Sequence, residues 1–126
     1  MLKIKNKIIG DQWPVYIIAE IGINHNGSLK LCKKMITEAK KSGADAVKLQ
    51  ISNPIYSYCS NTNSFKIFIK NQLQLNELII IKNFCKKINI TFCATPGDFQ
   101  SLEVIKKLKF PAIKISSGLI TNLPLI

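Results

Sequence analysis

The chain has 126 residues, of which 47% are hydrophobic and 20% are charged, so it can form the core of an ordinary globular domain and is not a disordered polypeptide. The formal net charge is +11, but all 18 cations are lysines and arginine is absent. Planar, bidentate recognition of phosphate and guanine favours arginine, and the lysines are spread over the polar faces of the predicted helices. The charge therefore indicates a solvated surface rather than a nucleic-acid-binding face.

The first predicted element is a buried strand over residues 15–23, which runs into a polar turn at residues 24–27. Ser28 is then predicted to cap a helix, and Ser42 and Gly43 end it. The apolar positions of this helix follow a helical period: Leu29, Cys32, Ile36 and Ala39. Residues 44–49 form a second predicted strand.

The stretch of residues 51–74 reads as an extended loop with one short helix around residues 64–70. Asn76 is predicted to cap the next helix, and residues 90–94 form a third strand. Asp98 is predicted to cap another helix, Pro111 ends that connection, and residues 112–115 form a fourth strand. The apolar stripes of these last two helices are Leu78, Ile81, Cys85 and Ile88 in one, and Leu102, Ile105 and Leu108 in the other.

Apolar strands that alternate with amphipathic helices predict an α/β fold, with parallel strands joined by right-handed crossover helices. Four such strands fit either a small open sheet or the first half of a closed barrel. An open sheet exposes its edges, and the apolar segment that ends at Ile126 offers no covering element. We therefore expect residues 1–126 to be part of a larger fold.

Polar residues collect where each predicted strand ends, which in parallel α/β folds is the ligand-binding edge. They are Glu20 and Asn24 after the first strand, Lys48 and Gln50 after the second, Thr95 after the third, and Lys114, Ser116 and Ser117 after the fourth. Lys48 and Lys114 stand in apolar surroundings, where a lysine needs an anion or a path to water. Together with nearby hydroxyl groups they predict a site for a phosphate dianion. Glu20 is either a catalytic acid or only an internal partner for one of these lysines.

Four cysteines and one histidine show no metal-binding spacing. We expect Cys32, Cys85 and Cys93 to be buried free thiols, and His25 to be a hydrogen-bonded turn residue rather than a ligand. No signal peptide and no apolar run long enough to cross a bilayer are visible, so we expect a soluble, cytoplasmic protein.

Two long blocks of the sequence resemble the sialic acid synthases, the family of N-acetylneuraminate, legionaminate and pseudaminate synthases. Residues 17–50 carry AEIG, NHNG and GADAVK-x-Q. Residues 92–126 carry ATP-x-D and K-x-x-S-G-x-x-T-N-L-P-L. The resemblance implies the N-terminal half of a (β/α)8 TIM barrel. The later strands and the C-terminal antifreeze-protein-like domain of that family would be absent from this chain.

The resemblance also implies a reaction. The methylene carbon of the enol phosphate in phosphoenolpyruvate attacks the aldehyde of an open-chain N-acetyl amino sugar, water adds at the carbon that carries the phosphate, and phosphate leaves. By this likeness, Glu20 would handle the proton or the attacking water, and Gln50 would contact the sugar. The phosphate and carboxylate of phosphoenolpyruvate would be held by Lys48, Thr95, Lys114 and Ser117.

Two substitutions depart from the family pattern, and the family's metal ligands and C-terminal domain would be missing from this chain. Leu119 stands where the family usually has an acidic residue that helps to hold the sugar, and Gly97 stands where a phenylalanine is common. The family's divalent metal, typically manganese, is held by two histidines on later strands, and the completed site belongs to a homodimer. We therefore expect the isolated chain to show little or no turnover.

Two other functions stay open. The chain could be a non-catalytic partial barrel that binds a small anion or pairs with another polypeptide, because a half barrel exposes apolar surface. A basic nucleic-acid-binding domain is the third reading, which the absence of arginine disfavours.

Overall fold

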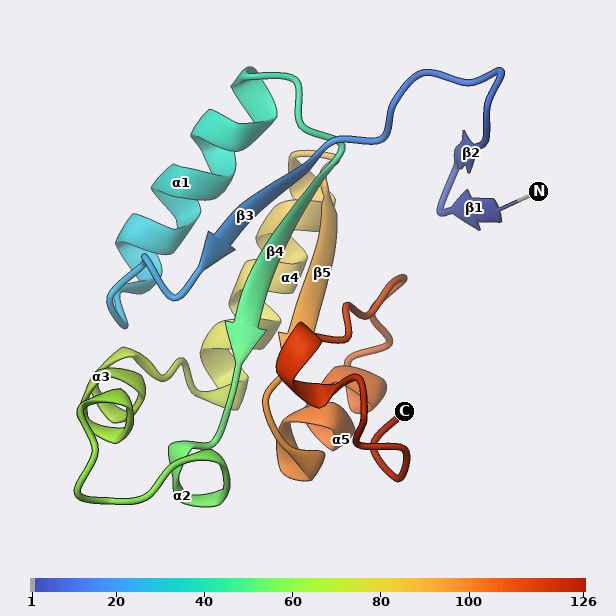
Figure 1. The fold of residues 1–126 in the computed structure, drawn as a ribbon. Coiled ribbons are helices and arrows are strands. Elements are labelled where there is room, and N and C mark those ends of the chain that lie inside the picture. Colours follow the sequence, from blue (N-terminus) through green and yellow to red (C-terminus); the bar gives the residue numbers. More distant parts are fainter. Residues whose placement is uncertain (1) are drawn as a thin grey trace.

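The computed structural model describes residues 2–126, which form a three-stranded parallel sheet with helices (Figure 1). The strands are β3 (Ile18–Gly22), β4 (Ala46–Ile51) and β5 (Thr91–Pro96), and β4 lies between the other two. The predicted parallel pairing is confirmed, since β4 is parallel to both β3 and β5.

The predicted fourth strand at residues 112–115 is wrong as a regular element. This segment makes a single parallel bridge, between Ile113 and Ala94, supported by a 3.0 Å hydrogen bond from the Lys114 N–H to the Ala94 carbonyl. Pro111 has no N–H to donate, and within residues 2–126 no strand pairs with the other side of the segment. One-sided pairing of so short a segment does not sustain a ladder.

The helices that follow the strands begin largely where predicted. In α1 (Leu29–Lys41), the Ser28 hydroxyl accepts a 3.2 Å hydrogen bond from the Leu31 N–H, which confirms this cap. In α5 (Phe99–Lys107), the Asp98 carboxylate accepts a 2.8 Å bond from the Ser101 N–H, as expected. The Asn76 cap is wrong. In α4 (Leu75–Lys87) the capping residue is Gln74, whose N–H donates to the Glu77 carboxylate at 2.8 Å.

The connection after β4 contains two helices rather than the single one predicted. They are α2 (Pro54–Ser57) and α3 (Asn63–Asn71), and the side chains of Asn53 and Thr62 cap them. Pro54 at the first helical position has the fixed φ that a helix start favours. Both helices lie near the carboxyl end of β4, beside the predicted ligand-binding edge (Figure 1).

The hydrophobic core lies between the sheet and helices α1 and α4. The strands bury Val47, Leu49 and Phe92 toward these helices, which bury Ile36 and Ile81. Because side chains alternate across a strand, Glu20, Lys48 and Cys93 project from the opposite face. This face is the one available for chemistry.

The cysteines behave as expected in three positions: Cys32, Cys85 and Cys93 are buried free thiols, whereas Cys59 is exposed. Burial raises the pKa of Cys32 and of Cys85 to about 12, so these thiols stay protonated at neutral pH. Within residues 2–126, no helix combines the length and hydrophobicity that a membrane-spanning segment requires.

An antiparallel hairpin of β1 (Leu2–Ile4) and β2 (Lys7–Ile9) precedes the sheet and was not predicted. Its turn places Lys5 at a φ of 51°. The Lys7 ammonium forms an ion pair with the Asp45 carboxylate, which joins the hairpin to the start of β4.

Candidate active site

A polar chain crosses all three strands on the open face of the sheet. The Lys48 Nζ atom on β4 lies 2.6 Å from Glu20 Oε2 on β3 and donates a 2.9 Å hydrogen bond to Thr95 Oγ1 on β5. The strand register produces this arrangement, because it sets Glu20 opposite Lys48. The internal ion pair that the sequence allows as an alternative role for Glu20 is therefore present, with Lys48 as the partner.

The two charged side chains of this row differ in how much solvent reaches them, and the difference affects what each can do. The Lys48 side chain is 7% exposed, whereas the Glu20 side chain is 56% exposed. A lysine ammonium has three N–H donors, and in Lys48 the Glu20 carboxylate and the Thr95 hydroxyl accept two of them. The third N–H can donate to a further acceptor, such as a bound anion. The exposed Glu20 carboxylate remains accessible to a proton or to water.

Lys114 shares a cavity with Lys48 and Glu20. The cavity has a volume of about 370 Å³ and is lined by Ile4, Ile18, Glu20, Lys48, Cys93, Ala112, Ile113 and Lys114. The two lysines therefore reach one space from neighbouring segments, although the fourth segment is not a regular strand. Two ammonium groups and one carboxylate give this cavity a net positive lining, suited to an anion.

A second cavity, of about 310 Å³, lies beyond the carboxyl ends of β4 and β5. Gln50 and Thr95 line it from the sheet, and Tyr58 and Phe68 line it from the long connection. The short 3₁₀ helix η1 (Ser117–Leu119) borders it, with Leu119 in the lining. Thr95 links the two spaces, because it bonds to Lys48 and also lines this second cavity.

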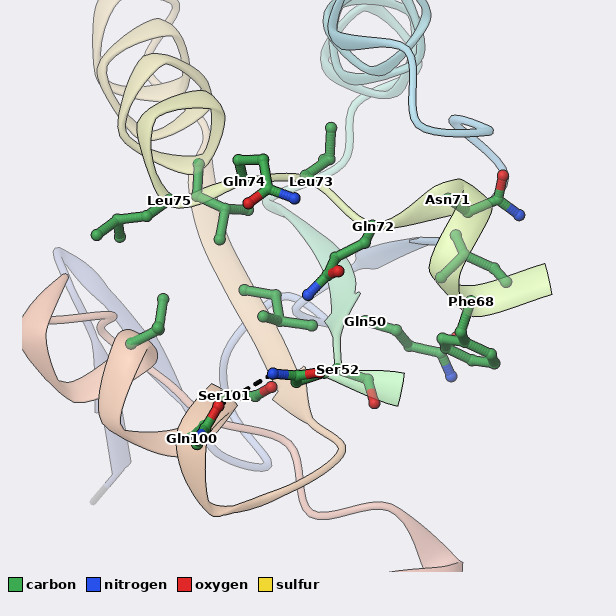
Figure 2. Close-up of a pocket in the computed structure, with 15 residues that line it drawn as sticks. Gln50, Ser52, Phe68, Asn71, Gln72, Leu73, Gln74, Leu75, Gln100 and Ser101 are labelled. Atoms are coloured by element: carbon green, nitrogen blue, oxygen red, sulfur yellow. Dashed lines mark hydrogen bonds between the residues drawn. The ribbon is translucent and has the colours of Figure 1, made fainter. Parts of the chain in front are cut away.

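A third cavity, of about 190 Å³, adjoins the second and shares Gln50 and Phe68 with it (Figure 2). Its lining contains no charged side chain, and its amide groups come from Gln50, Asn53, Asn71, Gln72, Gln74 and Gln100. The Asn53 amide donates a 3.0 Å hydrogen bond to the Gln100 side chain. Neutral amides beside apolar side chains suit a polyhydroxylated, uncharged ligand.

Asn24, expected at this edge, is exposed and lines none of the three cavities, and of the six residues that the resemblance assigns to the site, Ser117 is the one that does not reach them. It is exposed in η1 and lines none of the three spaces, whereas its neighbour Ser116 lines the second. The other five predicted residues each line at least one cavity.

Asp98 does more than the predicted capping. Its carboxylate is buried and accepts hydrogen bonds from the Asn53 N–H at 2.6 Å and from the Ser101 hydroxyl at 2.8 Å. The Ser57 and Ser52 hydroxyls lie 3.2 and 3.3 Å from the same oxygen. Asp98 thus joins the loop after β4 to the loop after β5. The only sequence signal for this role is the place of Asp98 in the Ala-Thr-Pro-x-Asp motif of residues 94–98.

His25 is a turn residue, as predicted. It is buried, its Nδ1 accepts a 3.2 Å hydrogen bond from the Gly27 N–H, and burial lowers its pKa below the ordinary value. Gly27 has a φ of +72° and packs against α3, so that an added Cβ would lie 2.8 Å from the Lys70 carbonyl oxygen. The NHNG turn therefore packs against α3, in the connection between β4 and α4, and holds it beside the strand ends.

Residues 2–126 do not offer a complete metal site: no three His, Cys, Asp or Glu side chains among them are grouped closely enough to bind an ion together. The residues described therefore do not fit the divalent metal that the resemblance implies.

Comparison with known proteins agrees with the observed fold. The family model named NeuB matches residues 35–126. An N,N'-diacetyllegionaminic acid synthase of Campylobacter jejuni is 39% identical over 86% of the chain, and an N-acetylneuraminate-9-phosphate synthase of Drosophila melanogaster is 38% identical over 89% of it. The chain spans about a third of the length of these relatives, 36% and 34% respectively.

Solved structures give the same result. An N-acetylneuraminic acid synthetase from Leptospira borgpetersenii, crystallised with citrate, superposes with a TM-score of 0.92 at 35% identity. It covers 98% of this chain, and the match covers 44% of that protein. With the shared motifs, the shared fold and the clustered polar residues, the chain belongs to the NeuB family.

Proposed function

We propose that the chain serves in the phosphoenolpyruvate-dependent condensation with an N-acetyl amino-sugar aldehyde that yields a nonulosonic, sialic-type acid. The supporting observation is that Lys48 and Lys114 line one cavity with Glu20. This is the lining that a ligand with a phosphate and a carboxylate requires, because each anion needs a cation already in place.

The proposed reaction divides between the cavities. Lys48 and Lys114 hold the phosphate and carboxylate of phosphoenolpyruvate, and Thr95 orients the Lys48 ammonium through their 2.9 Å hydrogen bond. Gln50 contacts the sugar from the adjoining uncharged space. The methylene carbon of phosphoenolpyruvate bonds to the aldehyde carbon as its C=C double bond breaks, and the aldehyde oxygen takes up a proton. Water then adds at the neighbouring carbon that carries the phosphate and loses a proton, and the C–O bond to phosphate breaks so that inorganic phosphate leaves. Glu20, the exposed carboxylate of the site, receives or delivers the proton.

The proposal includes a larger assembly. We infer that the three strands and the bridged segment are the first part of a (β/α)8 barrel, and that metal ligands come from outside residues 2–126. The antifreeze-like domain and the dimer expected from the resemblance belong to the same proposal. The Leu119 side chain lines the second cavity and cannot accept a hydrogen bond, so we infer that the sugar is held without a carboxylate at that position.

Calorimetric titration of the chain with phosphoenolpyruvate tests the proposal. We expect saturable binding that Lys48→Met and Lys114→Met each weaken by about tenfold or more, since each loses a charge-assisted contact worth about 1.5–3 kcal/mol. Lys87→Met is the matched control, because Lys87 is an exposed lysine on α4 that lines none of the three cavities. Equal weakening by all three variants would contradict the proposed site.

A turnover assay with Mn²⁺, phosphoenolpyruvate and N-acetylmannosamine tests the second part. We expect little or no product from the chain by itself. Robust product would show that residues 1–126 suffice and that the inference of missing metal ligands is wrong.

A non-catalytic role in pairing with another chain is the second candidate, and exposed apolar residues beside β3 favour it. Val15 is 83% exposed and Ile17 is 54% exposed, next to a strand that pairs on one side only within residues 2–126. Size-exclusion chromatography distinguishes the two cases, since a clean monomer at all concentrations argues against pairing.

A further inference from the structure

A fourth cavity, of about 270 Å³, lies apart from the candidate active site and has a different chemical character. Four lysines line it, Lys5, Lys82, Lys86 and Lys109, together with Cys85, Ile90, Phe92, Phe110 and Pro111. These residues come from the hairpin turn, from α4, from the start of β5 and from the segment after α5. The cavity is therefore built by four separate parts of the chain.

Its charge is not compensated by the protein. None of the lining residues is acidic, and within residues 2–126 none of the four lysines forms an ion pair with a carboxylate. Lys82 and Lys86 are four residues apart on one helix, where like charges repel. Burial raises the pKa of the Cys85 thiol, and the positive charge of Lys5 opposes this rise, so Lys5 acts electrostatically on a lining residue of the cavity. An anion in the cavity would relieve this repulsion.

Its interior, by contrast, is apolar. Cys85, Ile90 and Phe92 are buried, and the Phe92 and Phe110 rings pack with their centroids 4.7 Å apart. A bare inorganic anion would leave this surface without a partner. A ligand with an apolar body would cover it while its charged group faces the lysines.

The cavity is also separate from the site described above. Phe92 and Cys93 are consecutive on β5 and project to opposite faces of the sheet. Cys93 lines the cavity of Lys48 and Lys114, whereas Phe92 lines this one, and the two cavities share no residue.

We propose that this four-lysine cavity binds a small organic anion with an apolar body, such as an aromatic carboxylate. The ammonium groups hold the carboxylate as point charges, and the apolar body lies against Ile90, Phe92 and Phe110. This site is independent of the condensation proposed above.

Calorimetric titration with naphthalene-1-carboxylate is the test. We expect binding with one site per chain, weakened by about tenfold when sodium chloride rises to about 0.5 M, because salt screens partly exposed charges. Two further titrations separate the two features of the ligand. Acetate has the same carboxylate but lacks the apolar body, and 1-naphthylmethanol lacks the charge, so each should bind about tenfold more weakly or worse.

A matched pair of double variants locates the site. Lys82→Gln with Lys86→Gln removes two lining charges from α4 and should weaken binding about tenfold. Lys30→Gln with Lys34→Gln removes two charges at the same spacing from α1, a helix of equal length that does not line the cavity, and should leave binding unchanged. Lys109→Gln, on another element, should weaken binding too, and thermal unfolding verifies that each variant is folded.

Three results would overturn the proposal. They are the absence of saturable binding, equal weakening by the α1 and α4 pairs, and equal affinity for naphthalene-1-carboxylate and 1-naphthylmethanol. The second would mean that only the overall charge attracts the probe, and the third that the cavity is merely an apolar groove.

Discussion

Lys48 is the residue on which the candidate site depends. Its surroundings allow a role in ligand binding to be separated from a role in stability. Replacing one partner of a buried ion pair normally leaves the other partner buried without compensation. Here that other partner, Glu20, is 56% exposed and can regain water. We therefore expect Lys48→Met to change the free energy of unfolding by no more than about 1 kcal/mol, the range of ion pairs that solvent reaches. Urea unfolding measures this, and a loss of several kcal/mol would show that Lys48 holds the fold rather than a ligand.

Asp45 predicts a pH dependence at the same scale. Its hydrogen bond with the Lys7 ammonium, followed by the one from the Ile17 N–H, holds its pKa below the ordinary value. A carboxyl whose pKa is lower in the folded state stabilises the fold above its unfolded pKa, and this contribution disappears as pH falls through the folded pKa. Lys7→Met should therefore lower stability at pH 7 by up to about 1 kcal/mol. The difference from the unmodified chain should vanish near pH 2. A difference that persisted there would mean that Lys7 acts through packing instead.

Among the connections, the NHNG turn combines a positive φ at Gly27 with a close backbone contact. Gly27→Ala would place a Cβ 2.8 Å from the Lys70 carbonyl oxygen at a φ of +72°, so we expect a loss of about 2–4 kcal/mol in urea unfolding. Gly43→Ala isolates the φ effect, because Gly43 has a φ of +87° but nothing within 4 Å, and it should cost about 1 kcal/mol. Equal losses in the two variants would show that the contact with α3 is unimportant.

Asp98 joins two connections at the carboxyl edge of the sheet. Asp98→Ala removes the α5 cap and the bonds to Asn53 and Ser101, and should cost about 2–4 kcal/mol. Thr62→Ala removes only the cap of the exposed α3 and should cost about 1 kcal/mol. Urea unfolding of both variants compares them. If Asp98→Ala cost no more than Thr62→Ala, its bonds to the β4 connection would contribute nothing.

For the whole molecule, the free side of β3 decides how the chain behaves in solution. Exposed apolar residues beside an unpaired strand favour association. We expect the chain to self-associate, and Val15→Lys with Ile17→Lys to shift it toward monomer by light scattering. Ile120→Lys with Leu123→Lys is the control, since it adds the same two charges at apolar residues that are 63% and 76% exposed but belong to another segment. The edge would be irrelevant if the control had the same effect.

The sequence by itself determined the three strands, the helices packed on them, the caps at Ser28 and Asp98, and the family motifs. These follow from local periodicity and from side chains that bond within a few residues. It also grouped Glu20, Lys48, Gln50, Thr95 and Lys114 at one edge, because parallel strands bring their carboxyl ends together.

Only the tertiary structure decided the rest. It paired Lys48 with Glu20 and Thr95, contacts between strands whose register no single segment encodes. It left residues 112–115 with one bridge, since a strand forms only where a neighbour pairs with it, and it placed Ser117 outside the cavities. It also brought four lysines from separate elements around one apolar cavity. The physical reason is the same in each case: these features depend on contacts between residues distant in the chain, whereas periodicity and capping depend on neighbours.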